Sequence, residues 1–176
     1  MDKKLLFLWQ KVEEENINVL FHPIKCPPDN LLAAYINCPG MKPSIILDNS
    51  LRYERTLFRC IFAEEIGHHM MGVSTNFFKA ERSYRYELHR GRDENKAMRW
   101  ATDVLIPDID LYLAIKRQGL AEVYELAEYF NVTIPFMMDK LKFVKSTYRW
   151  EEKVKTQLGK LHIVVGGGRE FEAIMS

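Results

Sequence analysis

The stretch IFAEEIGHHMMG, residues 61–72, decides how this sequence is interpreted. It closes a helix that the sequence predicts over about residues 51–71, because Leu57, Ile61 and Phe62 recur at helical spacing and are expected to face a core. Four ionisable side chains interrupt the apolar surface in the second half of this helix. Charged groups in an apolar helix need a partner, so the stretch is expected either to bind a ligand or to expose an acidic face.

The spacing of the ionisable side chains favours a metal site. Glu64 and His68 are four residues apart, so on a helix they lie one turn apart on the same face and can bind one ion. Only the first letter departs from His-Glu-x-x-His, the spacing of zinc peptidases. Glu65 is placed to act as a general base toward a catalytic water. The alternative pairing of Glu65 with His69 puts Ile66 at the base position, and isoleucine cannot take a proton.

A catalytic metal site requires a third protein ligand and an open position. Glu94 is the candidate, in a second predicted helix over residues 92–106 that Pro107 ends. It lies 26 residues beyond His68, and that gap can hold a loop and return a helix alongside the first. Gly67 has no side chain and is expected to let another backbone approach at this level.

The alternative interpretation is an acidic helix that binds no metal. Glu and His four residues apart also occur on helices by chance, so Glu64 and Glu65 would then form a solvated face. His69 is interpreted as a surface histidine or as one that supports a ligand. The apolar residues around the pair favour the metal, since a cation would partner carboxylates in an apolar setting.

Composition limits the class of protein. With 47% hydrophobic and 28% charged residues among 176, the chain has the make-up of one soluble globular domain. A net charge of +1 produces no overall attraction to nucleic acid or membrane. No stretch approaches the roughly 20 apolar residues of a membrane span, and the N-terminus does not have the pattern of a signal peptide. Three cysteines without a secretion signal predict reduced thiols and a cytoplasmic location.

The order of predicted elements indicates an α+β domain with a small three-stranded sheet. The expected elements are helices over 3–15, 51–71 and 92–106, strands within 17–24, 31–38 and 43–48, and C-terminal helices over 108–118, 120–130 and 133–144. The second and third strands form a hairpin through Pro39-Gly40, and Asn49-Ser50 caps the helix that follows. Residues 73–91 are expected to form a long polar loop, and residues 164–176 a weakly ordered tail.

Four stretches resemble the ImmA/IrrE family of small gluzincin-type metallopeptidases from phages, mobile elements and bacterial genomes. PSIILDNSL (43–51) resembles the family's edge strand and active-helix start, FAEEIGHHMMG (62–72) its metal-binding helix, ENKAMRWATDVLIP (94–107) its second signature, and VYELAEYFNVTIPFMMDKLKF (123–143) its helical C-terminal part. The resemblance implies a minimal zincin-like fold, in which the sheet packs on a metal-binding helix pair. It places that core in residues 1–106, a helical subdomain of the same compact unit in 107–146, and a tail in 147–176.

The resemblance makes Glu65 the general base, His68 a zinc ligand and Glu94 the acidic third ligand. The usual residue at position 64 is histidine, so Glu64 is interpreted as a substitute ligand. A Glu/His/Glu set is a harder donor set and carries two negative charges, which suits Mn²⁺ or Fe²⁺ as well as Zn²⁺. It should also acidify a bound water less, which predicts weaker zinc binding or lower hydrolytic power.

The resemblance implies a peptidase that cleaves or inactivates a Cro/CI-type helix-turn-helix repressor and relieves repression in a phage or mobile element. The strand at Ser44–Leu47 is expected to pair with an extended substrate, unless it is plain sheet core. Tyr84, Tyr86 and His89, in the predicted loop before Glu94, are candidates for oxyanion stabilisation or substrate contact, although loop aromatics also serve in packing.

Two other classes of function stay open. Residues 125–143 have the sequence pattern of a helix-turn-helix, which would make the protein a DNA-binding regulator. The second helix argues against this class, because residues 134–138 are mostly apolar and read base edges poorly. Only Lys140 and Lys142 suit phosphates. The other class is a catalytically weak or inactive peptidase that acts by binding a protein.

Overall fold

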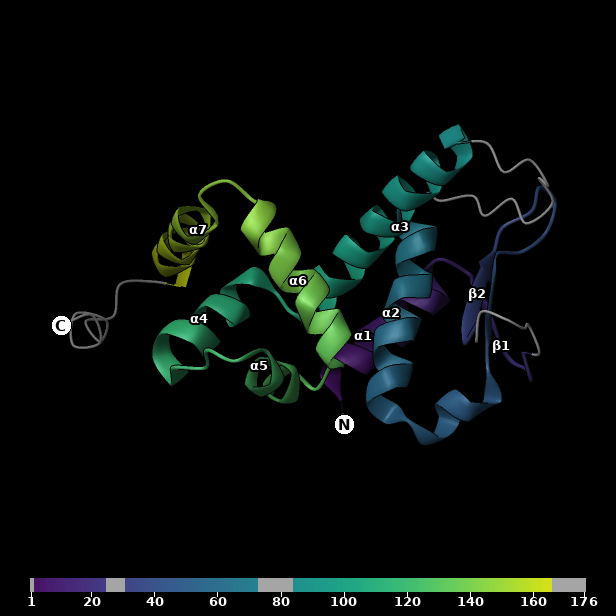
Figure 1. The fold of residues 1–176 in the computed structure, drawn as a ribbon, viewed down its shortest axis with the longest axis horizontal. Helices are drawn as coiled ribbons and strands as arrows, with labels where there is room; N and C mark the ends of the chain where they lie inside the picture. The colour runs from purple at the N-terminus through teal and green to yellow at the C-terminus, as the bar shows by residue number, and fades with distance from the viewer. Residues whose placement is uncertain (1, 25–30, 73–83, 166–176) are drawn as a thin grey trace.

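The computed structural model describes residues 2–24, 31–72 and 84–165, apart from the side chains of 84–90 and 159–165. The elements are α1 (Lys3–Glu14), β1 (Asn18–Phe21), β2 (Ala33–Ile36), β3 (Ser44–Leu47), η1 (Asn49–Tyr53), α2 (Arg55–Met70), α3 (Tyr84–Leu105), α4 (Asp108–Gln118), α5 (Val123–Phe130), α6 (Ile134–Ser146) and α7 (Trp150–Val165). The sheet lies at one end of the molecule, α1, α2 and α3 lie in the middle, and the remaining helices lie at the other end (Figure 1). The predicted α+β class is confirmed.

The three strands form one mixed sheet in the order β1-β3-β2. β2 and β3 are antiparallel, as the predicted hairpin requires, whereas β1 runs parallel to β3. Burial alternates along β2 and β3, so Tyr35, Ile45 and Leu47 point into the core, where both strands pack on α2. The expectation that Ser44–Leu47 is an edge strand is wrong. β3 is the central strand, and its backbone groups are already paired on both sides.

The helix predicted from residue 51 is divided into two pieces. Asp48, rather than Asn49 or Ser50, caps the first piece, η1, because its carboxylate accepts a hydrogen bond from the Ser50 backbone at 2.9 Å. Hydrogen bonds from Ser50 and from the Ile24 backbone lower the pKa of Asp48 to about 2. Glu54, at φ −120° and ψ 79°, breaks the helical path before α2 begins.

The packing of α2 on α3 confirms the role expected for Gly67. A Cβ atom at Gly67 would lie 2.5 Å from the carbonyl oxygen of Ala97, so any larger residue would force the helices apart. On α3 the facing positions Ala97, Ala101 and Leu105 are fully buried and four residues apart, which places them on one side of the helix. This close contact fixes how the ends of the two helices meet.

Helix α3 begins earlier than the sequence predicts. It starts at Tyr84, so the second half of the expected loop over 73–91 is helical backbone. The sequence of this segment is polar and has no apolar residues at helical spacing, so the sequence predicted a loop there. The predicted end of the helix is confirmed, since α3 stops at Leu105, two residues before Pro107.

The C-terminal helices follow the predicted order. Gly119 ends α4 in the left-handed region at φ 69°, and Thr133 caps α6 through its hydroxyl. The backbone N–H of Thr133 also contacts the Cys60 thiol at 3.4 Å, so Cys60 is a buried packing residue of α2. Helix α7 was not predicted, and the remainder of the expected tail, 166–176, lies outside the described residues. Every described helix is too short or too polar to cross a lipid bilayer.

Candidate metal centre and active site

Three ligand-type side chains from two helices meet where α2 and α3 pack. Glu64 and His68 lie one turn apart on α2, and Glu94 approaches from α3. One potential ligand atom from each residue lies within 4.8 Å of the other two. The structure therefore brings together the three residues that the sequence predicted as ligands.

The geometry of this cluster fits a divalent cation. Zinc bonds to oxygen and nitrogen are about 2.0–2.2 Å long, so two ligands of one ion can be up to about 4.4 Å apart. The observed donors need only small side-chain rotations to reach that limit. Two carboxylates and one imidazole are a donor set for zinc, manganese or iron(II). A cation would also relieve the repulsion between Glu64 and Glu94.

His68 is the best-positioned member of the cluster. Its side chain is almost fully buried, and its Nε2 atom lies 3.2 Å from a carboxylate oxygen of Glu94. Burial alone would lower the pKa of His68, but the hydrogen bond with Glu94 and the nearby carboxylates raise it. The Nδ1 atom is buried and has no hydrogen-bond partner among the described residues. The Nε2 atom of His68 therefore points toward the other two side chains of the cluster, which is the orientation that a metal ligand needs.

The carboxyl group of Glu65 lies beside the cluster in a poorly solvated position. Burial raises the pKa of Glu65 to about 7, and the charges of Glu64 and Glu94 add to that effect. His68 and a hydrogen bond from the Tyr35 backbone N–H act in the opposite direction. A carboxyl group with a pKa close to neutral suits an acid–base role, which is the role that the sequence predicted for it.

A second histidine belongs to a network that the sequence did not reveal. The Nδ1 atom of His69 lies 2.8 Å from the hydroxyl of Tyr35, and its Nε2 atom lies 3.4 Å from a carboxylate oxygen of Glu15. Tyr35 is the residue whose backbone contacts Glu65. His69 thus supports the strand beside the candidate base, and only the pairing of distant segments could have shown this.

The predicted oxyanion candidates have a different local structure from the one expected. Tyr84, Tyr86 and His89 lie in the first turns of α3 rather than in a loop. Their side chains lie outside the described part of the structure, so their contacts with a substrate stay a prediction.

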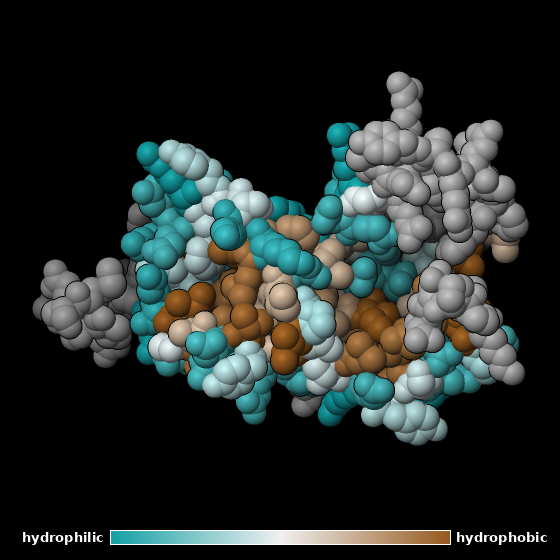
Figure 2. Space-filling view, viewed as in Figure 1, coloured by the Kyte–Doolittle hydropathy of each residue, from teal (hydrophilic) through white to brown (hydrophobic). Residues whose placement is uncertain are grey.

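A groove opens beside the candidate metal centre. It has a volume of about 640 Å³ and lies between α3 and α6, where Glu64 and Glu94 of the candidate centre line it together with residues such as Phe143 and Ser146. The two helices diverge in Figure 1, and Figure 2 shows a hollow in the surface above them. A peptide bound at the centre could extend into this groove.

Comparisons with known proteins agree with the geometry. A search of the curated proteins and a search of the solved structures returned no significant match. The family model of the M78 peptidases, described as an IrrE N-terminal-like domain, matches residues 12–142. That match covers all three strands, the α2–α3 pair with its Glu64/His68/Glu94 cluster, and most of α6. The chain therefore belongs to the M78 peptidase family with an IrrE N-terminal-like domain.

Proposed function

We propose that this protein is a metal-dependent endopeptidase whose substrate is a helix-turn-helix repressor of the Cro/CI type. The observation that carries the proposal is the meeting of Glu64, His68 and Glu94 beside Glu65 in a chain of the M78 peptidase family. The donor set supports zinc, with manganese or iron(II) as alternatives.

Glu64, His68 and Glu94 would hold the cation. A bound divalent cation supplies Lewis acidity toward a peptide carbonyl and lowers the pKa of a water molecule. The two ligand carboxylates would offset both charges of a divalent cation, so the site would acidify water less than a site with two histidines. Because the water would be less acidic, catalysis would depend more on Glu65 as the base that removes its proton.

Glu65 has the surroundings of a proton shuttle. Its carboxylate accepts a proton from the attacking water and then donates that proton to the leaving amine. One group thus serves first as general base and then as general acid. The Tyr35 backbone N–H orients the carboxylate through a hydrogen bond. The ring of Tyr35 is itself held by His69, so the strand and the helix are fixed relative to each other at the point of reaction.

The outer edge of β2 is the position that we assign to an extended substrate. β2 ends the strand order β1-β3-β2, so one of its edges is unpaired in the described sheet, unlike either edge of β3. Its residue Tyr35 already contacts the candidate base. A peptide added at this edge would pass over the centre, in the manner of β-strand addition.

Cleavage of a repressor would act by separating its DNA-binding part from the rest of the chain, which relieves repression. The family match supports the peptidase domain, and the resemblance of the sequence to ImmA/IrrE proteins supports this choice of partner. A location in the cytoplasm and a link to a phage or mobile element belong to the same proposal.

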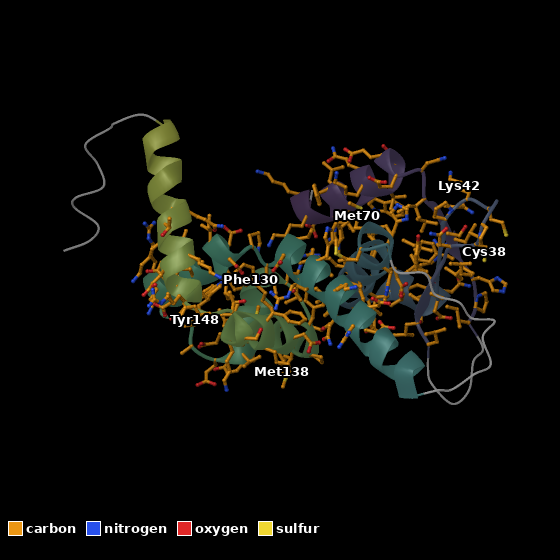
Figure 3. The ribbon with its side chains drawn as sticks, turned by 90° about the horizontal axis from the view of Figure 1, so that it is seen from above. Cys38, Lys42, Met70, Phe130, Met138 and Tyr148 are labelled. Carbon is orange, nitrogen blue, oxygen red and sulfur yellow. The ribbon has the colours of Figure 1, made fainter. Side chains whose placement is uncertain are left out.

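The structure argues further against DNA binding by α5 and α6. Lys140, which suited phosphate by its position in the sequence, is only 1% exposed and ion-paired with Asp103 and Asp108. Lys142 pairs with Asp139, and the exposed Met138 lies on the outer surface of α6 (Figure 3). Of the two lysines that suited phosphates, only Lys142 is thus open to solvent, which weakens the case for a phosphate-binding helix.

Metal content tests the site first. Elemental analysis of purified protein supplied with zinc or manganese should find one equivalent of metal in the wild type and none in His68→Ala. His22→Ala, which removes an exposed histidine outside the cluster, is the matched control and should keep its metal. An absence of metal from the wild type would contradict the assignment of Glu64 as a ligand.

Cleavage of candidate repressors tests the activity. The metal-loaded wild type should cut its partner, and Glu65→Gln should retain metal and partner binding while losing cleavage by at least about 100-fold. A variant that keeps full biological activity without cleavage would instead identify a protein that acts by binding alone.

A further inference from the structure

We propose that the groove between α3 and α6 binds a carboxylate of the substrate through Arg99, so that the protein selects peptides with an acidic group near the cleaved bond. The proposal rests on the peptidase function proposed above and adds a class of substrate to it. It follows from the position, the contacts and the charge balance of the residues that line the groove.

The position of Arg99 relates the groove to the reaction centre. Glu64 and Glu94 line the groove together with Arg99, which lies five residues, or about 7.5 Å along the helix axis, beyond Glu94 on α3. Consecutive residues of an extended peptide are about 3.3 Å apart. A residue close to the bond held at the centre can therefore bring its side chain to Arg99.

The contacts of Arg99 hold its guanidinium in place without neutralising it. The group lies 4.8 Å from the centre of the Phe143 ring, and one of its nitrogens lies 3.4 Å from the Ser146 hydroxyl. An arginine stacked on an aromatic ring keeps its N–H groups free at the edge of the plane, in a geometry that matches a carboxylate. Met98, beside Arg99 in the lining, offers an apolar surface to the methylene groups of an acidic side chain.

The charge balance of the groove favours an anion. A divalent cation at the centre would neutralise Glu64 and Glu94, which leaves three cations and Asp139 along the lining. Lys142 is paired with Asp139 at 2.8 Å, and Lys96 is paired at 3.0 Å with Asp93, outside the groove. Within the described residues, no carboxylate pairs with Arg99. The groove thus has one uncompensated positive charge close to the site of cleavage.

The carboxylate could come from an Asp or Glu side chain or from the C-terminus of a peptide, and the test separates these sources. Two peptide libraries are prepared, both acetylated at the N-terminus, one with an amidated and one with a free C-terminus. Zinc-loaded wild type is incubated with each library, and the cleaved positions are identified by mass spectrometry. Zinc-loaded Glu65→Gln is immobilised, and the peptides that it captures are identified in the same way, which gives a readout independent of activity.

The expected result is an enrichment of about tenfold for Asp and Glu over Asn and Gln at one position near the bond, in both cleavage and capture. Arg99→Gln should remove this preference, and Arg99→Glu should shift it toward Lys and Arg. The matched control is Arg52→Gln, because Arg52 stacks on Phe21 at 3.9 Å and lies outside the lining of the groove. An enrichment confined to free C-termini would support the groove and identify the α-carboxylate as its ligand.

Other results separate the two proposals. Cleavage without acidic preference, or a preference that survives in Arg99→Gln, would overturn the inference and leave the peptidase function intact. Capture that is acidic and depends on Arg99, without cleavage of any peptide, would keep the groove assignment and overturn the peptidase function.

Discussion

Two clusters of ionisable side chains join the helices of this protein, and their charges are balanced in opposite ways. Lys140 of α6, 1% exposed, contacts Asp103 of α3 at 2.6 Å and Asp108 of α4 at 2.5 Å. The cluster at the candidate metal centre also has two carboxylates, Glu64 and Glu94, but its third member is a histidine. The first cluster includes a lysine, which is a permanent cation, whereas the three members of the second include only a histidine as a basic side chain.

This difference shows what distinguishes a structural site from a ligand site. A lysine brings a charge that stays in place as the chain folds, so the Lys140 cluster needs nothing from outside. A histidine that serves as a metal ligand is neutral, so at the candidate centre a bound ion would supply the positive charge beside Glu64 and Glu94. The Lys140 cluster therefore stabilises the fold without a ligand, whereas the candidate metal centre adds stability when a cation binds.

Metal binding should produce the largest difference between the clusters. Because a ligand that binds only the folded state stabilises it, zinc at 1,000 times its dissociation constant should raise the free energy of unfolding by about 4 kcal/mol. Denaturant titrations with zinc and with chelator should show this gain in the wild type but not in His68→Ala. An equal gain in both proteins would place the bound zinc elsewhere.

Removal of Lys140 should destabilise the protein with or without metal. Lys140→Ala loses the buried packing of the lysine side chain, while its two carboxylate partners keep contact with water, so the cost should be about 2 kcal/mol. Lys142→Ala, which removes an exposed lysine paired with Asp139, is the control and should cost less than about 0.5 kcal/mol. Chemical denaturation measures both. Similar losses for the two variants would show that the Lys140 cluster does not join the helices as the contacts imply.

Glu65 should make the metal-free protein less stable as the pH rises. Its folded pKa of about 7 lies above the ordinary value of 4.5, so the folded state binds the proton more tightly and stability falls between pH 4.5 and 7. Each pKa unit corresponds to about 1.4 kcal/mol, and partial solvation reduces the total to about 2 kcal/mol. In chelator, Glu65→Gln should therefore match the wild type at pH 4.5 and exceed it by that amount at pH 8. A constant difference across this range would contradict the prediction.

The contact between Tyr35 and His69 should have the smallest effect. Tyr35→Phe removes the buried hydroxyl that contacts His69 and should cost about 1 kcal/mol of stability, with no change in metal content. If the contact helps to position Glu65 through β2, cleavage should fall more than stability does. Tyr53→Phe is the control, because Tyr53 is 88% exposed. Equal effects of the two variants would remove any role for the network.

Sequence analysis predicted the elements and the ligand spacing because these are local properties. Glu64 and His68 fall on one face through helical periodicity alone, and Gly67 indicated the close approach that Ala97 makes. The approach of Glu94 was predicted from the family signature and the length of the gap. The order of α4, α5 and α6 and the break at Gly119 were predicted, although α5 begins at Val123 rather than near residue 120.

The wrong predictions concern the pairing of distant segments or weak local patterns. The central place of Ser44–Leu47 depends on β1 joining the hairpin as a parallel neighbour, which alternation along a strand does not specify. The early start of α3 and the presence of α7 escaped notice because their segments are polar or irregular. The burial of Lys140, which suited phosphates by its residue type, was not predictable because its two carboxylate partners lie 32 and 37 residues away.

The sequence by itself determined which residues could hold a metal and which could move a proton, because helical spacing and side-chain chemistry are set within one or two turns. Tertiary structure alone decided which strand edge is open, which lysine is neutralised and that Tyr35 joins His69 to Glu65. Those outcomes depend on contacts between segments 30 or more residues apart. Such contacts are selected by the burial of the whole chain, and no short stretch of sequence encodes them.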